Sequence, residues 1–528
     1  KAIWGGSFQA PGFYELACLD AKAGRFAEAL EHVNESILRQ YQCMKARALK
    51  ENILRKLGRV KEAEELHKES LKIDPLYDRQ PEKINHNTLL ELVIDLYEAG
   101  DYAQGITLAE KWVKQQNVSR QEDIYPLVYY YIAYGYQNLH RKENTEQANC
   151  YMTMYVTLGE NAAADGCFPH RTEDYIVLKS LAEEYHLAMA YYYLGCLLYD
   201  RRVYDESIED YEESILRSPD FPTVHRNLAL AYYNVKKLPQ RAYEEMEKAF
   251  ALDETDARVY LELDQLKKRL NVAVKERWSD MEKHFDLVES RDDLYLEYVT
   301  LLNTLGEPEK ALGLIKARKF HQWEGGEGKV AAQYLTALYQ LAKAAVEKED
   351  YAEAKELLLR AVGEYPHNLG EGKLESGQEN NLYYLLGLVQ EKLGEAKDAF
   401  ESLTRACCGE SEPVGMMYYN DQPPEMIYYQ GLAYRMLGEE EQAVRRFQKL
   451  VDYGREHIRD DVKIDYFAVS LPDLLIFEEN LNERNRKHCL FMMSLGLKGL
   501  GRIDEAEKCA EELLAMDNAH QEIRVHDL

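Results

Sequence analysis

The clearest candidate for chemistry in this sequence is the glycine-rich run at residues 325–329, which reads Gly-Gly-Glu-Gly-Lys. A phosphate-binding loop has a glycine five residues before its last glycine, and a serine or threonine after its lysine. Here Trp323 stands five residues before Gly328, and Val330 follows Lys329. We therefore interpret the run as a turn between helices rather than as a nucleotide site, since glycine readily adopts the positive φ angles of tight turns.

Four side chains around the glycine-rich run form a candidate loop site. They are an imidazole, an indole and two carboxylates, at His321, Trp323, Glu324 and Glu327. An aromatic ring flanked by glycines and carboxylates suits stacking on a sugar or contact with a peptide. We expect Trp323 to pack against neighbouring helices, with His321 and the carboxylates on the concave side of the fold. The alternative is a connector without a function.

Other combinations of reactive side chains give weaker signals. Cys167 and His170 have the spacing of two metal ligands, but no second pair follows nearby. There is no nucleophile motif of the Gly-x-Ser-x-Gly type, and among 93 acidic residues pairs of carboxylates occur by chance. We therefore assign no catalytic residue, no metal ligand and no cofactor, and we do not expect this chain alone to be an enzyme.

Charge and composition limit the partners. The 528 residues carry a net charge of −28, which repels phosphate backbones and anionic lipids, so nucleic acid and membranes are not expected partners. No stretch approaches the ~20 apolar residues that a membrane-spanning helix needs. Nine cysteines, an odd number, fit a reduced cytoplasm. Because the chain begins at Lys1 rather than at methionine, we expect it to belong to a longer protein.

The elements that must hold these side chains are paired helices. Residues 184–222 show the pattern best, with two helical faces joined by a turn at residues 200–202. The first face carries Tyr191, Leu194, Gly195 and Leu198, and the second carries Tyr204, Ser207, Tyr211 and Ser214. Small residues at such positions, Gly195 here and Gly387 in a later unit, allow two antiparallel helices to approach closely.

This template recurs along the chain with a period of about 34 residues, in about eleven or twelve units. The pattern resembles the tetratricopeptide repeat family. That resemblance implies an all-α fold, an α-solenoid of about 11–12 helix pairs that forms a right-handed superhelix. It also implies a scaffold for protein–protein interaction, which binds a peptide or protein partner.

Breaks in the period predict the organisation of the chain. We expect N-terminal repeats at 1–139, an irregular insertion at 140–183, central repeats at 184–290, a repeat-like unit with the glycine-rich loop 320–330 at 291–333, and C-terminal repeats at 334–528. Within the last part we expect insertions near 366–381, 407–424 and 460–483.

Tyrosines recur beside the predicted inner groove. The chain has 40 tyrosines against 13 phenylalanines, and several occupy the fifth and sixth positions of first helices: Tyr130, Tyr131, Tyr192, Tyr193, Tyr384, Tyr428 and Tyr429. Tyrosine combines a rigid contact surface with a hydroxyl group that forms hydrogen bonds. We expect this set to line a partner-binding groove; the alternative is that tyrosine merely fills the space between helices.

A narrower resemblance involves two segments. Residues 323–329, Trp-Glu-Gly-Gly-Glu-Gly-Lys, together with residues 466–473, Tyr-Phe-Ala-Val-Ser-Leu-Pro-Asp, are similar to bacterial proteins in which a tetratricopeptide array follows an N-terminal, mutarotase-like β-sandwich domain of uncharacterised function. This resemblance implies an upstream β-sandwich. It also implies an alternative function, as the helical portion of a carbohydrate-active or carbohydrate-binding protein that acts with that domain.

Overall fold

The structure of the protein, a computed structural model, describes residues 5–75, 84–116, 120–143, 146–323, 325–373, 377–415, 421–463 and 476–526. Within these ranges the regular elements are helices and no strand occurs, which confirms the predicted all-α fold. The chain forms two compact units, Lys1–Val224 and His225–Leu528.

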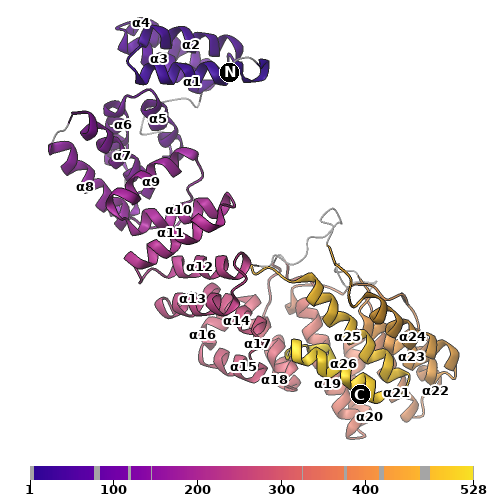
Figure 1. Cartoon of the computed structure of the whole chain (residues 1–528). Helices are drawn as coiled ribbons and strands as arrows, with labels where there is room; N and C mark the ends of the chain where they lie inside the picture. Colours follow the sequence, from indigo (N-terminus) through magenta and orange to yellow (C-terminus); the bar gives the residue numbers. More distant parts are fainter. Residues whose placement is uncertain are drawn as a thin grey trace. The chain divides into compact units, whose positions relative to one another are not determined.

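The first unit contains the helices from the N-terminus to α11 (Figure 1). Its elements are η2 (Gly6–Phe8), α1 (Gln9–Lys22), α2 (Phe26–Arg39), α3 (Met44–Lys56), α4 (Val60–Ile73), α5 (His86–Glu98), α6 (Tyr102–Gln115), η4 (Gln121–Asp123), α7 (Pro126–Glu143), α8 (Glu146–Asn161), α9 (Thr172–Tyr185), α10 (Ala188–Asp200) and α11 (Tyr204–Arg217).

Helix α12 (Pro222–Asn234) begins in the first unit and has most of its residues in the second. The later elements are α13 (Pro239–Leu252), α14 (Ala257–Arg269), α15 (Val274–Lys283), α16 (Phe285–Ser290), α17 (Asp292–Thr304), α18 (Pro308–Ala317), α19 (Lys329–Glu347), α20 (Tyr351–Val362), η5 (His367–Leu369), α21 (Asn380–Lys392), α22 (Ala396–Ala406), α23 (Pro424–Met436), α24 (Glu440–His457), α25 (Leu481–Gly499), α26 (Ile503–Met516) and α27 (Gln521–Val525).

Consecutive helices form twelve pairs within the described ranges, in agreement with the predicted eleven or twelve units. The pairs are α1/α2, α3/α4, α5/α6, α7/α8, α10/α11, α12/α13, α14/α15, α17/α18, α19/α20, α21/α22, α23/α24 and α25/α26. Helices α9, α16 and α27 stand outside this scheme. The chain is therefore an α-solenoid, and within a unit neighbouring pairs pack on each other, as α2 does on α3 and α20 on α21.

The turn within a pair has a recurring glycine signal. Seven first helices are followed by a glycine whose φ lies between 74° and 81°: Gly24, Gly58, Gly100, Gly306, Gly394, Gly438 and Gly501. After α1, the Arg25 amide donates to the Asp20 carbonyl at 2.8 Å, which closes the helix end as in a Schellman motif. Glycine is favoured there because a side chain is strained in the left-handed region.

Close approach within a pair depends on residues without a side chain. A Cβ placed on Gly195 in α10 would lie 2.5 Å from the ring of Tyr211 in α11. A Cβ placed on Gly387 in α21 would lie 2.7 Å from Cγ of Leu403 in α22. Both distances are too short for a real contact, so the predicted register of these two units is confirmed.

The segment 140–183, expected to be an irregular insertion, is largely helical. Helix α8 pairs with α7, and α9 packs against both α7 and α10. The departure from the period is therefore an additional helix rather than an irregular loop. The segment 466–473, singled out in the sequence, lies outside the described residues.

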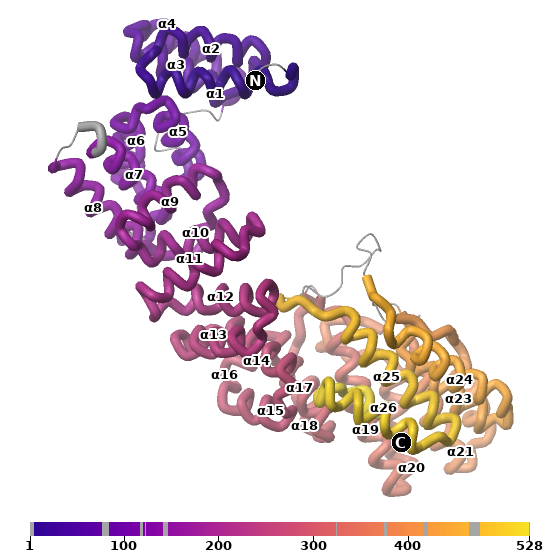
Figure 2. Tube along the Cα trace, viewed as in Figure 1, coloured from indigo at the N-terminus to yellow at the C-terminus, as the bar shows by residue number. Residues whose placement is uncertain are grey.

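The end of the second unit returns to the middle of the same unit. The Gln521 side chain donates to the carbonyl of Thr300 in α17, and Lys343 in α19 donates to the carbonyl of Val525. Figure 2 shows this end of the chain, in yellow, beside α17 and α19. Among the described helices, none is long and apolar enough to cross a membrane.

We predict that Gly387→Leu destabilises the second unit by roughly 1–3 kcal/mol or more, because the new side chain overpacks α21 against α22. The same reasoning applies to Gly195→Leu in the first unit. The measurement is the thermal unfolding midpoint by circular dichroism.

The matched control is Gly313→Leu in α18, where a Cβ would meet no atom within 4 Å. The control is expected to unfold at or above the wild-type temperature, since leucine has a higher helix propensity than glycine. Equal midpoints for Gly387→Leu and Gly313→Leu would contradict the packing described here.

Candidate functional site

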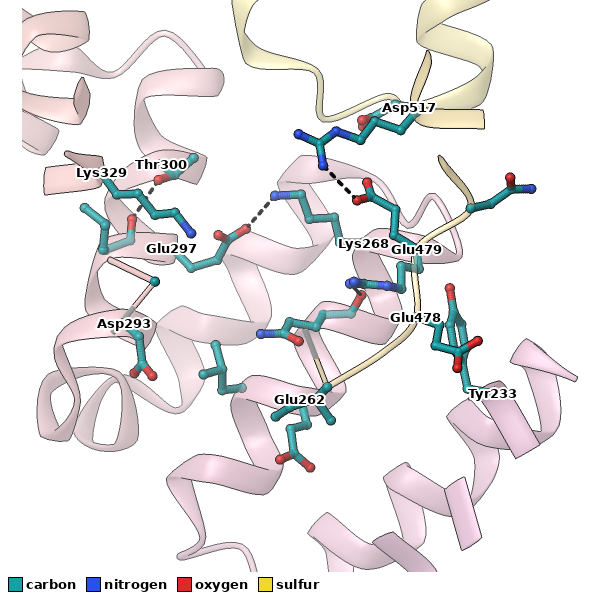
Figure 3. Close-up of a pocket in the computed structure, with 18 of the residues that line it drawn as sticks. Tyr233, Glu262, Lys268, Asp293, Glu297, Thr300, Lys329, Glu478, Glu479 and Asp517 are labelled. Atoms are coloured by element: carbon teal, nitrogen blue, oxygen red, sulfur yellow. Dashed lines mark hydrogen bonds and ion pairs between the residues drawn. The ribbon is translucent and has the colours of Figure 1, made fainter. Parts of the chain in front are cut away.

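The second unit contains a cavity of about 680 Å³ between two walls. One, named the array wall, consists of cavity-lining residues from α12, α14, α17, the glycine-rich loop and the start of α19. The other, named the C-terminal wall, consists of residues 476–480, the start of α25 and residues 516–517. Figure 3 shows acidic side chains of the C-terminal wall across from those of the array wall. The cavity therefore joins parts of the chain about two hundred residues apart.

The two walls have opposite charge balance. The array wall contributes five basic side chains (Arg258, Lys268, Arg269, Arg291 and Lys329) and three acidic ones (Glu262, Asp293 and Glu297). The C-terminal wall contributes four acidic side chains (Glu478, Glu479, Glu483 and Asp517) and two basic ones (Arg484 and Lys487). In a chain with a net charge of −28, a surface with excess positive charge is a local feature that the overall composition does not reveal.

A buried arginine fixes part of the array wall. Arg277 of α15 donates to both carboxylate oxygens of Asp264 in α14, at 3.0 and 2.6 Å, and to Glu297 in α17 at 2.7 Å. Burial opposes ionisation of Glu297, but the positive charges of Lys268 and Arg277 outweigh it and hold its pKa well below the usual range. Three helices are thus tied together directly behind the cavity.

A second buried carboxylate orders the same wall. Glu262 of α14 accepts two hydrogen bonds from Arg226 of α12, both at 2.6 Å, and one from Arg258 at 3.1 Å. The two-pronged arginine contact fixes the orientation of the carboxylate as well as its position. The array wall is therefore pre-organised by ion pairs that run from α12 to α17.

The C-terminal wall is held in place by hydrogen bonds between its backbone and the side chain of Asn234. The side-chain amide of Asn234, at the end of α12, donates to the Ile476 carbonyl and accepts from the Glu478 amide, both at 2.9 Å. The intervening Phe477 is fully buried, with its ring 5.1 Å from that of Tyr233 and 5.5 Å from the guanidinium of Arg269. One asparagine thus holds a non-helical stretch of chain while an aromatic pocket holds its side chain.

Of the described residues of the predicted loop site, Trp323 lies at the cavity, and His321 and Glu327 do not. Trp323 lines the cavity and packs over Gly326, where a Cβ would lie 2.2 Å from the indole. His321 is exposed and donates its backbone amide to Asp292 at 2.8 Å, and Glu327 is exposed outside the cavity lining. Glu324 lies outside the described residues.

The loop is held in place by an acidic side chain that the sequence did not single out. Glu371 accepts from the backbone amides of Gly328 and Ala331 at 2.7 and 2.8 Å. These amides belong to the N-terminus of α19, where a carboxylate is favoured by the helix dipole. Glu371 thus caps α19 and thereby holds the loop that carries the Trp323 indole.

The tyrosine set is a correction to the sequence analysis. Six of the seven residues are buried, with exposed fractions of 0–8%: Tyr130, Tyr131, Tyr192, Tyr193, Tyr428 and Tyr429. Tyr384 is half-buried, and its ring lies 5.5 Å from that of Tyr429. Several hydroxyls are satisfied internally, since Tyr130 donates to Glu160 at 2.6 Å and Tyr131 to Asp174 at 2.8 Å. The set therefore packs between helices rather than lining an open groove, because these positions face the adjacent helix.

Sequence reasoning missed the residues that hold the cavity together. Asn234, Arg269 and Phe477 belong to no motif, and their partners lie more than two hundred residues away. The described residues also include no group of three or more His, Cys, Asp or Glu side chains that could hold a metal ion. Within those residues, the arrangement offers binding contacts of both charges rather than a metal centre.

We predict that Arg277→Met destabilises the second unit by about 3–5 kcal/mol, because it leaves two carboxylates without their buried cation. The control, Arg291→Met, removes a comparable two-pronged contact to Asp293 at a side chain that is 39% exposed, and is expected to cost less than about 1 kcal/mol. Urea unfolding of both variants measures the difference. Similar losses in the two would show that the buried trio does not brace the wall.

Comparisons with known proteins agree with the repeating architecture. Models of the tetratricopeptide repeat match residues 14–78 and 339–413, and a second model of the same repeat matches residues 425–453. These stretches fall in both units, where the structure has antiparallel helix pairs.

Several solved structures align with the chain at low identity. The yeast Tom70 structure aligns at 12% identity with a TM-score of 0.26, covering 98% of this chain and 99% of that chain. YrrB, described as a TPR protein with an unusual peptide-binding site, aligns at 18% identity with a TM-score of 0.27, covering 35% and 90%. A tetratricopeptide repeat protein from Parabacteroides merdae aligns at 14% identity with a TM-score of 0.22, covering 58% and 98%. Since the repeat models match three separate stretches and helix pairs recur through both units, the chain contains tetratricopeptide repeats.

Proposed function

We propose that the chain is a protein–protein interaction scaffold whose second unit binds a polypeptide segment of a partner in the cavity between the array wall and the C-terminal wall. Arrays of this family present their first helices as a continuous surface, and α12, α14, α17 and α19 are the first helices of successive pairs. The cavity lies on that surface, so a partner segment held there contacts several repeats at once.

The observation that carries this proposal is the contact between Asn234 and residues 476–478. Hydrogen bonds to both a carbonyl and an amide of the same strand of chain are a sequence-independent way to hold a peptide. The buried ring of Phe477 adds a pocket for one side chain. This face of the array thus already binds a non-helical peptide segment, supplied by its own chain, and the adjoining cavity offers the same surface to another.

Charge favours polypeptide as the ligand. Both walls carry side chains of each sign, and many are already paired, as Arg291 is with Asp293 and Lys487 is with Glu483. A ligand that enters must match an alternating pattern rather than a uniform field, which suits a peptide with both acidic and basic residues and disfavours a polyanion. The volume of about 680 Å³ accommodates a few side chains rather than a folded domain.

A carbohydrate ligand is the second candidate, and one observation favours it. The indole of Trp323 lines the cavity together with the carboxylates of Asp293 and Glu297. An aromatic face beside carboxylates can stack on a sugar and accept from its hydroxyls. Because both candidates use the same cavity, blocking it tests the location for either, and the choice of probe separates them.

The experiment fills the cavity without removing a contact. Peptides are first selected from a phage-displayed library of random sequences on the full chain, and their Kd values are measured by fluorescence anisotropy. We expect Ala332→Trp, at an exposed position on the cavity lining of α19, to weaken the selected peptides by at least tenfold, because the indole occupies their space.

The control is Ala352→Trp, an exposed alanine of α20 outside the cavity lining, which is expected to leave the Kd unchanged. Selected peptides that bind Ala332→Trp as tightly as wild type would place the binding surface elsewhere. The carbohydrate candidate would instead be supported by two results together: the selection yields no binding peptide, and the wild-type chain binds a glycan array whereas Ala332→Trp does not.

A further inference from the structure

The segment 515–526 begins with the last two residues of α26 and lies on the second unit at a surface beside the cavity. Beyond α26 its helix is α27, which spans the five residues Gln521–Val525. Isolated helices shorter than about 12 residues are marginal in water, so the helical form of this segment depends on the surface that receives it. That surface is formed by the turn after α14 and by α17, α19 and α23.

The first contact of the segment is a reciprocal pair of asparagines. The Asn518 amide donates to the side-chain oxygen of Asn271 at 2.7 Å, and the Asn518 side chain donates to the Asn271 carbonyl at 2.6 Å. The Asn271 side chain also donates to the Ala515 carbonyl at 3.1 Å. As at Asn234, an asparagine side chain near the end of a first helix forms hydrogen bonds with the backbone of a distant segment, here residues 515–518.

The second contact satisfies a buried glutamine. Gln521 is 7% exposed, and its amide nitrogen donates to the Thr300 carbonyl at 3.2 Å and to the Thr304 hydroxyl at 3.1 Å. Its oxygen accepts from the side chain of Gln333 at 2.9 Å. A residue without an amide at this position would leave the side-chain amide of Gln333 without this acceptor, so the surface favours glutamine.

The third contact is an aromatic box that holds an imidazole. The ring of His526 lies 5.6 Å from that of Tyr339 and 5.5 Å from that of Tyr429, and its Nδ1 is 3.1 Å from the Tyr429 hydroxyl. Burial, with the nearby charge of Lys343, lowers the pKa of His526 to about 3, so the imidazole is neutral at pH 7. It can therefore accept from Tyr429, which in turn can accept from Tyr339 at 2.6 Å.

The fourth contact engages the end of the short helix. The Lys343 ammonium donates to the Val525 carbonyl at 2.9 Å, at a helix C-terminus, where a positive charge is favoured. In α23, burial together with the charge of Glu522 raises the pKa of Glu425 to about 8, so Glu425 is mostly neutral at pH 7 and repulsion between the two carboxyls is small. The surface is thus matched to both ends of the segment.

We propose that this surface of α17, α19 and α23 is a docking site for a short helical peptide with glutamine at its first position and histidine five residues later, and that residues 515–526 of the chain occupy it in cis. The segment buries the side chains of Ile523 and Val525, and it also makes polar contacts, several of them through its backbone, which is typical of peptide capture. A partner helix with the same two side chains would compete for the site. This inference does not depend on the cavity ligand.

The test releases the segment and offers it back in trans. The full chain with Asn518→Ala and Gln521→Ala is compared with wild type for binding of a fluorescein-labelled synthetic peptide with the sequence of residues 515–526. We expect the double variant to lose amide-exchange protection over 521–526 and to bind the peptide at least tenfold more tightly than wild type, whose site is occupied. A peptide in which Gln521 and His526 are both alanine is the control and is expected not to bind.

A further variant separates the site from the segment. Adding Gln333→Ala to the double variant is expected to abolish the gain in peptide binding, because the amide partner on α19 is removed. If circular dichroism shows that the double variant is misfolded, His526→Lys replaces it, since an ammonium group does not fit the neutral aromatic box. Unchanged protection of 521–526 in the releasing variant, or release without a gain in peptide binding, would overturn the proposal. The probe is the chain's own segment, so either result leaves the cavity proposal to its own test.

Discussion

The close approach of two antiparallel helices is the constraint on which the rest of this structure depends. It is possible where one helix has no side chain at the crossing, as at Gly195 against the ring of Tyr211 and at Gly387 against Leu403. Once two helices are this close, the turn that joins them and the position of the next pair follow from the same geometry. The surface made by successive first helices is a product of that repetition.

The same close packing explains why the tyrosines do not form an open groove. In a solenoid each first helix has neighbours on both sides, so adjacent positions such as Tyr192 and Tyr193 are both buried: the ring of Tyr193 lies 6.1 Å from that of Tyr130 in α7, and the ring of Tyr192 lies 5.0 Å from that of Phe221. Some of the buried hydroxyls find partners inside the array, as Tyr130 does with Glu160. The polar tips that suggested recognition of a ligand in fact allow a large aromatic ring to be buried without losing a hydrogen bond.

The second unit differs from a plain array because its end folds back onto its own first helices. Two asparagines near the C-terminal ends of first helices, Asn234 at the end of α12 and Asn271 just after α14, each hold the backbone of a returning segment. Between those two contacts lies the cavity, with an array wall that is braced from behind by Arg277. The proposed binding surface and its support share residues, since Glu262 and Glu297 both line the cavity and take part in the ion pairs that brace it.

The sequence by itself determined the class of fold, the approximate number of units and the tight positions at Gly195 and Gly387, since these follow from contacts within about 34 residues. It also identified Trp323 as a residue of interest, although not the carboxylate of Glu371 that fixes its loop. Only the tertiary structure decided which surfaces are available. The contact of His526 with Tyr429 joins residues 97 positions apart, and the contact of Asn234 with Ile476 at the cavity joins residues 242 positions apart. No local period encodes such pairings, because they depend on how the accumulated geometry of many helix pairs brings the end of the unit back to its middle.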